Sequence, residues 1–291
     1  MRVRVSTRRL CFDGTYVRFK LYTPEDGKVL RRCAFVCSPL GDAESWDSLS
    51  RILASQGCLC LAFELPGFGH TPVGAPQDNM TRASILWGVL DEVDISRGED
   101  GSKWHLVTHG SGCHVALEMA RTQPDSVLSR VFISPVTHRF GYNRRSYSLG
   151  KLRVKLYTKV YGFYEKHPSY FFNKIARLYG TDLPSERLDK LSREFFRDGR
   201  MESLVRLFEK GYWLHNKSLG IENPLMLIWG KSDPFGQRPD ELLMRSINDV
   251  EVHYISAAHM SMETMPQEIS EYLKGWFDFV EGRMKTPAKK K

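Results

Sequence analysis

The chain has 291 residues, of which 42% are hydrophobic and 12% aromatic, so it can bury a large core. No run of about 18 apolar residues is present to span a bilayer, and no apolar signal-peptide segment follows the basic start. The formal net charge of +8 is concentrated in one internal stretch. We therefore expect a cytoplasmic protein with one core domain.

Apolar runs alternate with segments of helical periodicity along the first 134 residues. The segments on either side of Asp13 and Gly14 alternate in polarity and predict an antiparallel hairpin at the sheet edge. Buried strands are predicted over residues 33–37, 58–64, 104–108, 130–134, 225–229 and 252–256, and helices over 45–57, 80–95 and 113–123. This rhythm predicts an α/β fold, a mainly parallel sheet of about eight strands with helices on both faces.

The strand and helix rhythm stops after Ser134 and resumes near Pro224. The intervening stretch of about ninety residues is too long for a loop. We therefore predict an inserted helical cap at 137–222. The discontinuous core is then 1–136 with 223–282, and 283–291 form a basic tail.

The predicted cap is basic and aromatic. From Arg139 to Tyr179 there are ten Lys or Arg residues against the single acid Glu165, and eleven Phe or Tyr residues. The plainest interpretation is a cap core of aromatic rings under a solvated basic face. Alternatively, the charge attracts an anionic small-molecule substrate or associates weakly with an acidic membrane surface. No nucleic-acid module is visible, so no nucleic acid partner is expected.

The cysteines and glycines do not indicate a cofactor. Cys33, Cys37, Cys58 and Cys60 lie in apolar runs without zinc-site spacing and predict buried free thiols. The Gly-rich stretch 66–76 is not followed by the Gly-Lys-Ser/Thr of a phosphate loop. We therefore expect no metal and no cofactor.

Three co-linear stretches together resemble one family. They read FVCSPLGDAESW with LAFELPGFGHT, then HLVTHGSGCHVAL, then PLMLIWGKSDPF with VHYISAAHMSMETMPQEISEYLKGWF. In this order they are similar to the oxyanion loop, the nucleophile turn, the acid loop and the histidine loop of the cap-bearing α/β-hydrolase fold family, over roughly 30–135 and 222–280. The resemblance implies hydrolysis of small ester, amide or related apolar substrates in a pocket between core and cap.

The resemblance places the catalytic acid at Asp233 and the base at His259. A serine hydroxyl attacks only when an imidazole removes its proton, and a carboxylate must hold that imidazole in the correct tautomer. Without the resemblance, Asp233 is a turn-former before Pro234 and His259 is a loop histidine.

The nucleophile position departs from the family pattern, and two registers are open. In the first, Ser111 is the nucleophile, with His109 and Cys113 two residues away on either side, where the strained turn needs small side chains. In the second, which we favour, Gly110 occupies the nucleophile position. Ser111 then contributes its backbone N–H to an oxyanion hole.

The oxyanion loop also departs from the pattern. Leu40, Gly41 and Asp42 stand where the family has His-Gly-x, and a carboxylate there opposes an oxyanion unless it points away. Three functions therefore remain open: a hydrolase that uses Ser111, Asp233 and His259, a catalytically inactive ligand-binding protein, and an enzyme in which Asp233 and His259 act as a general base without a serine.

Overall fold

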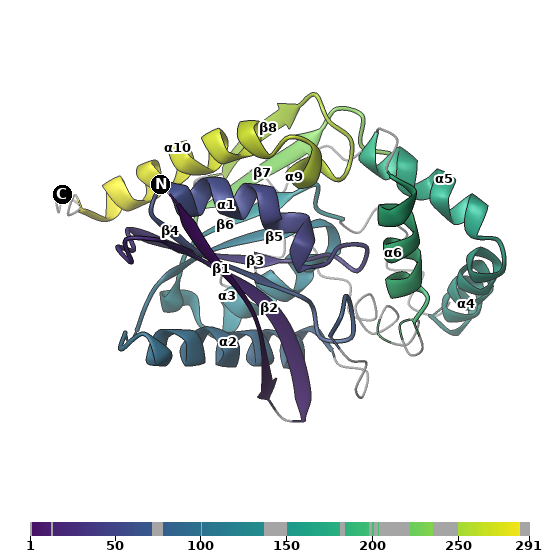
Figure 1. Cartoon of the computed structure of the whole chain (residues 1–291), viewed down its shortest axis with the longest axis horizontal. Coiled ribbons are helices and arrows are strands. Elements are labelled where there is room, and N and C mark those ends of the chain that lie inside the picture. The colour runs from purple at the N-terminus through teal and green to yellow at the C-terminus, as the bar shows by residue number, and fades with distance from the viewer. Residues whose placement is uncertain are drawn as a thin grey trace.

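The computed structural model describes residues 2–12, 14–71, 78–99, 101–136, 150–180, 184–197, 200, 203, 222–234 and 250–285. Within these ranges one eight-stranded sheet carries helices on both faces (Figure 1). The predicted α/β architecture is therefore confirmed.

The sheet begins with an antiparallel hairpin and continues in parallel. Strands β1 (Val3–Phe12) and β2 (Thr15–Pro24) pair antiparallel, and β2 pairs antiparallel with β4. The remaining strands are parallel: β3 (Arg31–Val36), β4 (Cys58–Phe63), β5 (Trp104–His109), β6 (Val127–Ile133), β7 (Leu225–Gly230) and β8 (Val250–Ile255). The order across the sheet is β1-β2-β4-β3-β5-β6-β7-β8. Of the two residues of the predicted turn, Gly14 has φ 73°, in the left-handed region, and Asp13 lies outside the described residues.

Among the residues that the structure describes, two pairs of helices cover the sheet. Helices α1 (Asp47–Ser55) and α10 (Pro266–Lys285) pack together on one face, and α2 (Asn79–Ser96) and α3 (Cys113–Thr122) pack together on the other (Figure 1). The predicted helix at 45–57 is shorter, because a 3-10 helix η1 (Ala43–Trp46) precedes α1. No helix in the described part of the chain is long and apolar enough to cross a membrane.

Burial of both faces explains the continuous apolar strands. In β3, Cys33 and Phe35 pack into the core with α1 and α10, whereas Ala34 and Val36 pack into the core with α2 and α3. The four cysteines of the apolar runs are buried free thiols, as predicted. Burial raises the pKa of the Cys33, Cys37 and Cys60 thiols.

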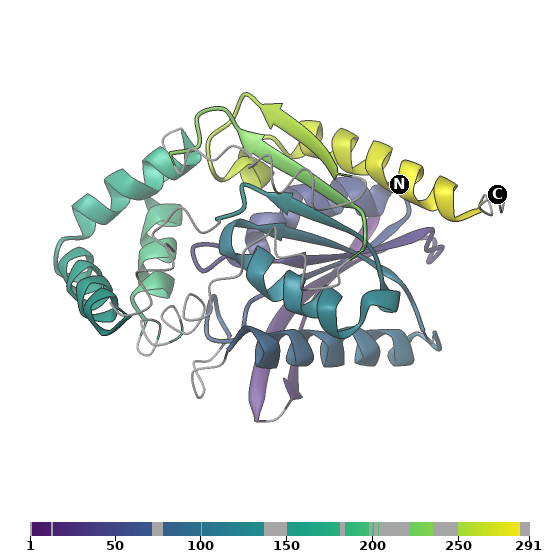
Figure 2. The same cartoon turned by 180° about the vertical axis from the view of Figure 1, so that it is seen from behind.

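Three of the helices that the structure describes, all between β6 and β7, lie beyond one end of the sheet (Figures 1 and 2). They are α4 (Gly150–Lys166), α5 (Pro168–Tyr179) and α6 (Ser185–Phe195). Their aromatic rings pack together: Phe171 contacts both Phe195 and Phe196, and Tyr161 contacts the same two rings. The predicted cap boundaries at 137 and 222 stay a prediction, because 137–149 and 204–221 lie outside the described residues.

Candidate active site

The predicted site residues lie in loops at one edge of the sheet. The carboxyl ends of parallel strands meet at a common edge, where α/β folds place their ligands. Gly110 follows the last residue of β5, Asp233 follows β7 and His259 follows β8. The loop after β3 also reaches this edge, and it contributes Ser38.

The loops after β7 and β8 bring Asp233 and His259 together. The backbone N–H of Ser232 donates to the carbonyl of Ala257 over 3.0 Å. Gly230 permits this approach, because a Cβ there would overlap the carbonyl oxygens of Ala257 and Ala258. As a result, His259 Nδ1 lies 2.9 Å from Asp233 Oδ2, and both side chains are 3% exposed.

The turn after β5 has the shape of a strained strand-to-helix turn. Gly110 has φ 54°, in the left-handed region that favours glycine. A Cβ on Gly110 would lie 3.5 Å from His259 Nε2, so this position faces the imidazole. A Cβ on Gly112 would meet the carbonyl oxygens of Cys37 at 2.7 Å and Val36 at 3.0 Å, so helix and strand pass closely only with glycine there.

Ser111 lies one residue beyond the position that faces His259. It is the middle residue of the short 3-10 helix η2 (Gly110–Gly112), and it is buried. The backbone carbonyls of Gly110 and Ser111 both accept from the N–H of Cys113, which joins the turn to α3. A side chain at Gly110, one residue earlier, would face His259 Nε2, and the choice between the two registers stays a prediction.

Sequence reasoning missed Ser38. A Cβ on Gly110 would lie 3.2 Å from Ser38 Cβ and 3.8 Å from Ser38 Oγ, so Ser38 supplies the nearest atom to the place where a side chain at position 110 would begin. Leu40, Gly41 and Asp42 instead follow in a turn closed by a 2.9 Å hydrogen bond from the N–H of Gly41 to the carbonyl of Ser38. The end of the predicted strand at Cys37 was the signal that could have identified Ser38.

His109 joins Ser38 to the histidine loop. Its Nε2 lies 3.1 Å from the carbonyl oxygen of His259, and its Nδ1 lies 3.1 Å from Ser38 Oγ. Burial, and then the neighbouring His259, hold the pKa of His109 well below its ordinary value, so the ring is neutral. A carbonyl can only accept, so Nε2 carries the proton and Nδ1 accepts from the Ser38 hydroxyl.

The Asp42 carboxylate is bound on two sides. It caps η1 by accepting from the N–H of Ser45 over 3.0 Å. Arg187 and Lys190 of α6 each approach Asp42 Oδ2 at 3.1 Å. Burial alone would raise the pKa of Asp42, but these two cations more than offset it and lower the pKa to about 2. The charge that sequence analysis expected near an oxyanion is therefore matched by cations of the cap.

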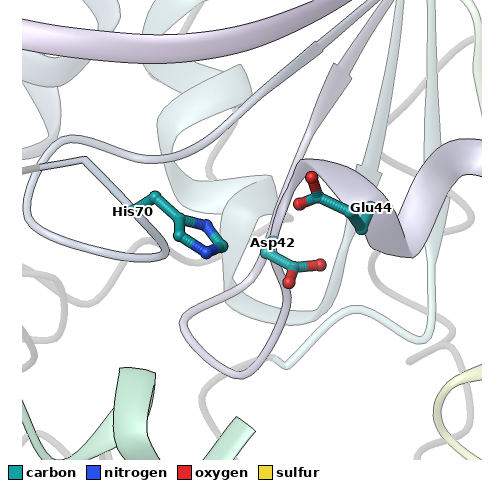
Figure 3. Close-up of side chains that lie close together, drawn as sticks. All are labelled: Asp42, Glu44 and His70. Carbon is teal, nitrogen blue, oxygen red and sulfur yellow. The ribbon is translucent and has the colours of Figure 1, made fainter. Parts of the chain in front are cut away.

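Asp42, Glu44 and His70 come together from two loops and offer three metal-type ligand atoms within 4.8 Å of one another (Figure 3). Each is already engaged by another side chain. Asp42 binds Arg187, Glu44 binds Arg18, and His70 Nδ1 lies 3.1 Å from Glu64. A cation would have to displace these ion pairs, so the group fits a network of salt bridges better than a metal centre.

Comparison with known proteins gives one family and a shared fold. The sequence model of the family described as Alpha/beta hydrolase family matches residues 35–272. None of the curated proteins compared with the chain matches it.

Solved structures with the same fold carry several activities in their descriptions. A bacterial membrane phospholipase A is 17% identical, with a TM-score of 0.73, covering 95% of this chain and 87% of that one. An epoxide hydrolase is 12% identical, with a TM-score of 0.74, covering 95% and 100%. A haloalkane dehalogenase variant from Bradyrhizobium elkanii is 14% identical, with a TM-score of 0.73, covering 97% and 99%. At these identities the likeness concerns the fold.

Proposed function

The chain belongs to the alpha/beta hydrolase family, and on that premise we propose that it hydrolyses small ester or amide substrates with His259 as a general base on water. One observation carries the proposal. The buried pair of Asp233 and His259 is in place, while the position that faces His259 Nε2 is Gly110, which has no side chain. An intact base facing a position without a nucleophilic side chain is suited to activating a water molecule.

The proposed reaction has two steps. In the first, His259 Nε2 takes one proton from water while the water oxygen bonds to the carbonyl carbon, and the carbonyl electron pair moves to oxygen. In the second, that pair re-forms the carbonyl as the bond to the leaving group breaks, and protonated His259 returns its proton to the leaving group. Asp233 holds the imidazole through Nδ1 and stabilises the charge that the ring gains.

The developing oxyanion has fewer backbone donors than two intact loops would supply. The N–H of Ser111 is the donor that follows the nucleophile position. In the oxyanion loop after β3, the N–H of Gly41 already donates to the carbonyl of Ser38 over 2.9 Å. We therefore expect slow turnover, best seen with esters whose leaving groups are good.

A serine mechanism at Ser111 is the less favoured form of the same activity. It would require the Ser111 hydroxyl to reach His259, whereas a side chain at Gly110 would begin only 3.5 Å from His259 Nε2. A fluorophosphonate probe should therefore leave the folded protein unlabelled, and Ser111→Ala should retain its ester hydrolysis. Labelling at Ser111 that is lost in Ser111→Ala would establish the serine mechanism instead.

The same missing side chain at Gly110 also favours a second candidate, a binding protein without turnover. Hydrolysis of p-nitrophenyl acetate by the wild type, His259→Ala and Asp233→Asn separates the two. We expect His259→Ala to lose at least about a hundredfold in kcat, the loss typical of a general base. The control is His253→Ala, because His253 lies on β8 beside Glu251, away from the Asp233 pair. No turnover by the wild type would support the binding protein, and equal turnover by His259→Ala would refute the general-base mechanism.

A further inference from the structure

We infer that Ser38 is a positioning residue that holds the attacking water against His259, an inference that rests on the proposed hydrolytic function. The first ground is the place of its side chain. Ser38 is 5% exposed, and its Cβ would lie only 3.2 Å from a Cβ on Gly110. This separation is tight for two side chains, so Ser38 fits without steric strain when position 110 is glycine.

The second ground is the direction of the Ser38 hydroxyl. His109 Nε2 carries the proton that it donates to the His259 carbonyl, so Nδ1 accepts the proton of Ser38 Oγ. A hydroxyl that has donated its one proton presents its oxygen to other groups as an acceptor. Ser38 therefore offers a fixed acceptor beside the vacant position at Gly110.

These directions orient a water molecule for attack. A water beside Gly110 donates one O–H to His259 Nε2 and the other to Ser38 Oγ, which leaves a lone pair of its oxygen for the substrate carbonyl carbon. Only the water proton that faces His259 Nε2 moves in this step, from the water oxygen to Nε2, and the Ser38 proton stays between Oγ and His109 Nδ1. Holding the nucleophile in this way reduces the entropy lost on reaching the transition state.

The structure disfavours Ser38 as the nucleophile itself. Its hydrogen-bond partner is His109, a fully buried ring whose pKa burial and His259 hold well below the ordinary value. Such a ring accepts a hydrogen bond but is a poor base for removing a serine proton. Attack by Ser38 is therefore an outcome for the experiment to exclude.

The test compares Ser38→Ala with the wild type in p-nitrophenyl acetate hydrolysis. We expect kcat to fall by about 10- to 100-fold with KM changed less than about threefold, because the water is misplaced while the substrate still binds. Ser45→Ala is the matched control, because it removes a buried hydroxyl of the neighbouring helix η1 that accepts a hydrogen bond from the N–H of Asp42. It should leave kcat within about twofold of the wild type.

Ser38→Thr keeps the hydroxyl and should retain kcat within about threefold of the wild type, which also covers the case in which Ser38→Ala fails to fold. If Ser38→Ala matches the wild type while His259→Ala is inactive, the positioning role is wrong and the proposed hydrolysis stands. If Ser38→Ala and His259→Ala both turn over the substrate as fast as the wild type, the proposed general-base mechanism itself fails. An acyl adduct on Ser38, found by intact-mass and peptide mass spectrometry, would overturn positioning in favour of direct attack.

Discussion

The candidate site has two halves, the loops after β7 and β8 and the loops after β3 and β5, and the two halves differ in how far they keep the family pattern. The loops after β7 and β8 are joined by backbone contacts, and Gly230 allows them to approach so closely that Asp233 and His259 meet. On the other half, the loops after β3 and β5 retain a close backbone approach at Gly112, but their residues depart from the family pattern at Gly110 and in the oxyanion loop at Asp42. The backbone frame of an active site can therefore persist while the reacting side chain changes, because the two depend on different residues.

The largest effect is expected from exchanging the side chains of the second half, in the double variant Ser38→Gly with Gly110→Ser. It puts a hydroxyl in the position that faces His259 and removes the neighbour that would crowd it at 3.2 Å. We expect fluorophosphonate labelling to rise from none to near one label per chain at position 110, read by intact mass. Gly110→Ser alone should label less, because of that crowding and the positive φ of 54°. Equal labelling of both variants would show that Ser38 does not restrict the position.

The next effect concerns the backbone frame. A Cβ in Gly112→Ala would meet two carbonyl oxygens at 2.7 and 3.0 Å, and backbone cannot move aside easily. The free energy of unfolding in urea should fall by about 3 kcal/mol. Gly275→Ala is the control, because Gly275 lies in α10 with open space around it. The free energy of unfolding of this variant should rise by about 0.5–1 kcal/mol. Unchanged stability in Gly112→Ala would show that the strand and the helix do not approach closely enough to exclude a Cβ at position 112.

A smaller effect should follow when the loop after β3 is separated from the cap. Asp42→Asn can still cap η1 but loses its charge pairs with Arg187 and Lys190, so the free energy of unfolding should fall by about 1–2 kcal/mol. The pKa of Asp42 is lowered from 3.8 to about 2, so its stabilising contribution is present above pH 4 and is lost as the pH falls toward 2.

Urea unfolding of the wild type and Asp42→Asn at several pH values measures this contribution. The difference between the two proteins should be constant from pH 5 to 7 and shrink below about pH 4. Asp42→Ala, which also removes the cap, should lose about 1 kcal/mol more. A difference that stays the same at low pH would show that the two ion pairs do not stabilise the fold.

The smallest effect is expected on the outer surface of the cap. Four exposed cations there belong to α4 and α5: Lys159, Lys166, Lys174 and Arg177. If the cap attracts acidic membranes, their replacement by Glu should weaken binding to phosphatidylserine vesicles several-fold at low salt, with little change for neutral vesicles. If the wild type binds acidic and neutral vesicles equally, or if the variant binds acidic vesicles as well as the wild type does, these residues only form a solvated face.

Much of the fold was predictable from sequence. Buried parallel strands are apolar on both faces, so runs such as 33–37 and 58–64 stand out from the helical segments between them. The resemblance to the family, through the order of its loops, also led to Asp233 and His259, and the structure brings these two side chains within hydrogen-bond distance. The cap was predictable only as an insertion, because its helices lack the regular rhythm of the core.

Only the tertiary structure decided which other side chains meet the base. Ser38 and Gly110 are far apart in sequence but become neighbours because β3 and β5 lie side by side and end at one edge. In the same way, Asp42 contacts Arg187, which lies 145 positions away in the sequence, and this cation offsets the negative charge that was expected to oppose an oxyanion. The local sequence pattern shows which residues along each strand or helix are buried. The chemistry of a site depends instead on contacts between loops, which are set by how the strands assemble into the sheet.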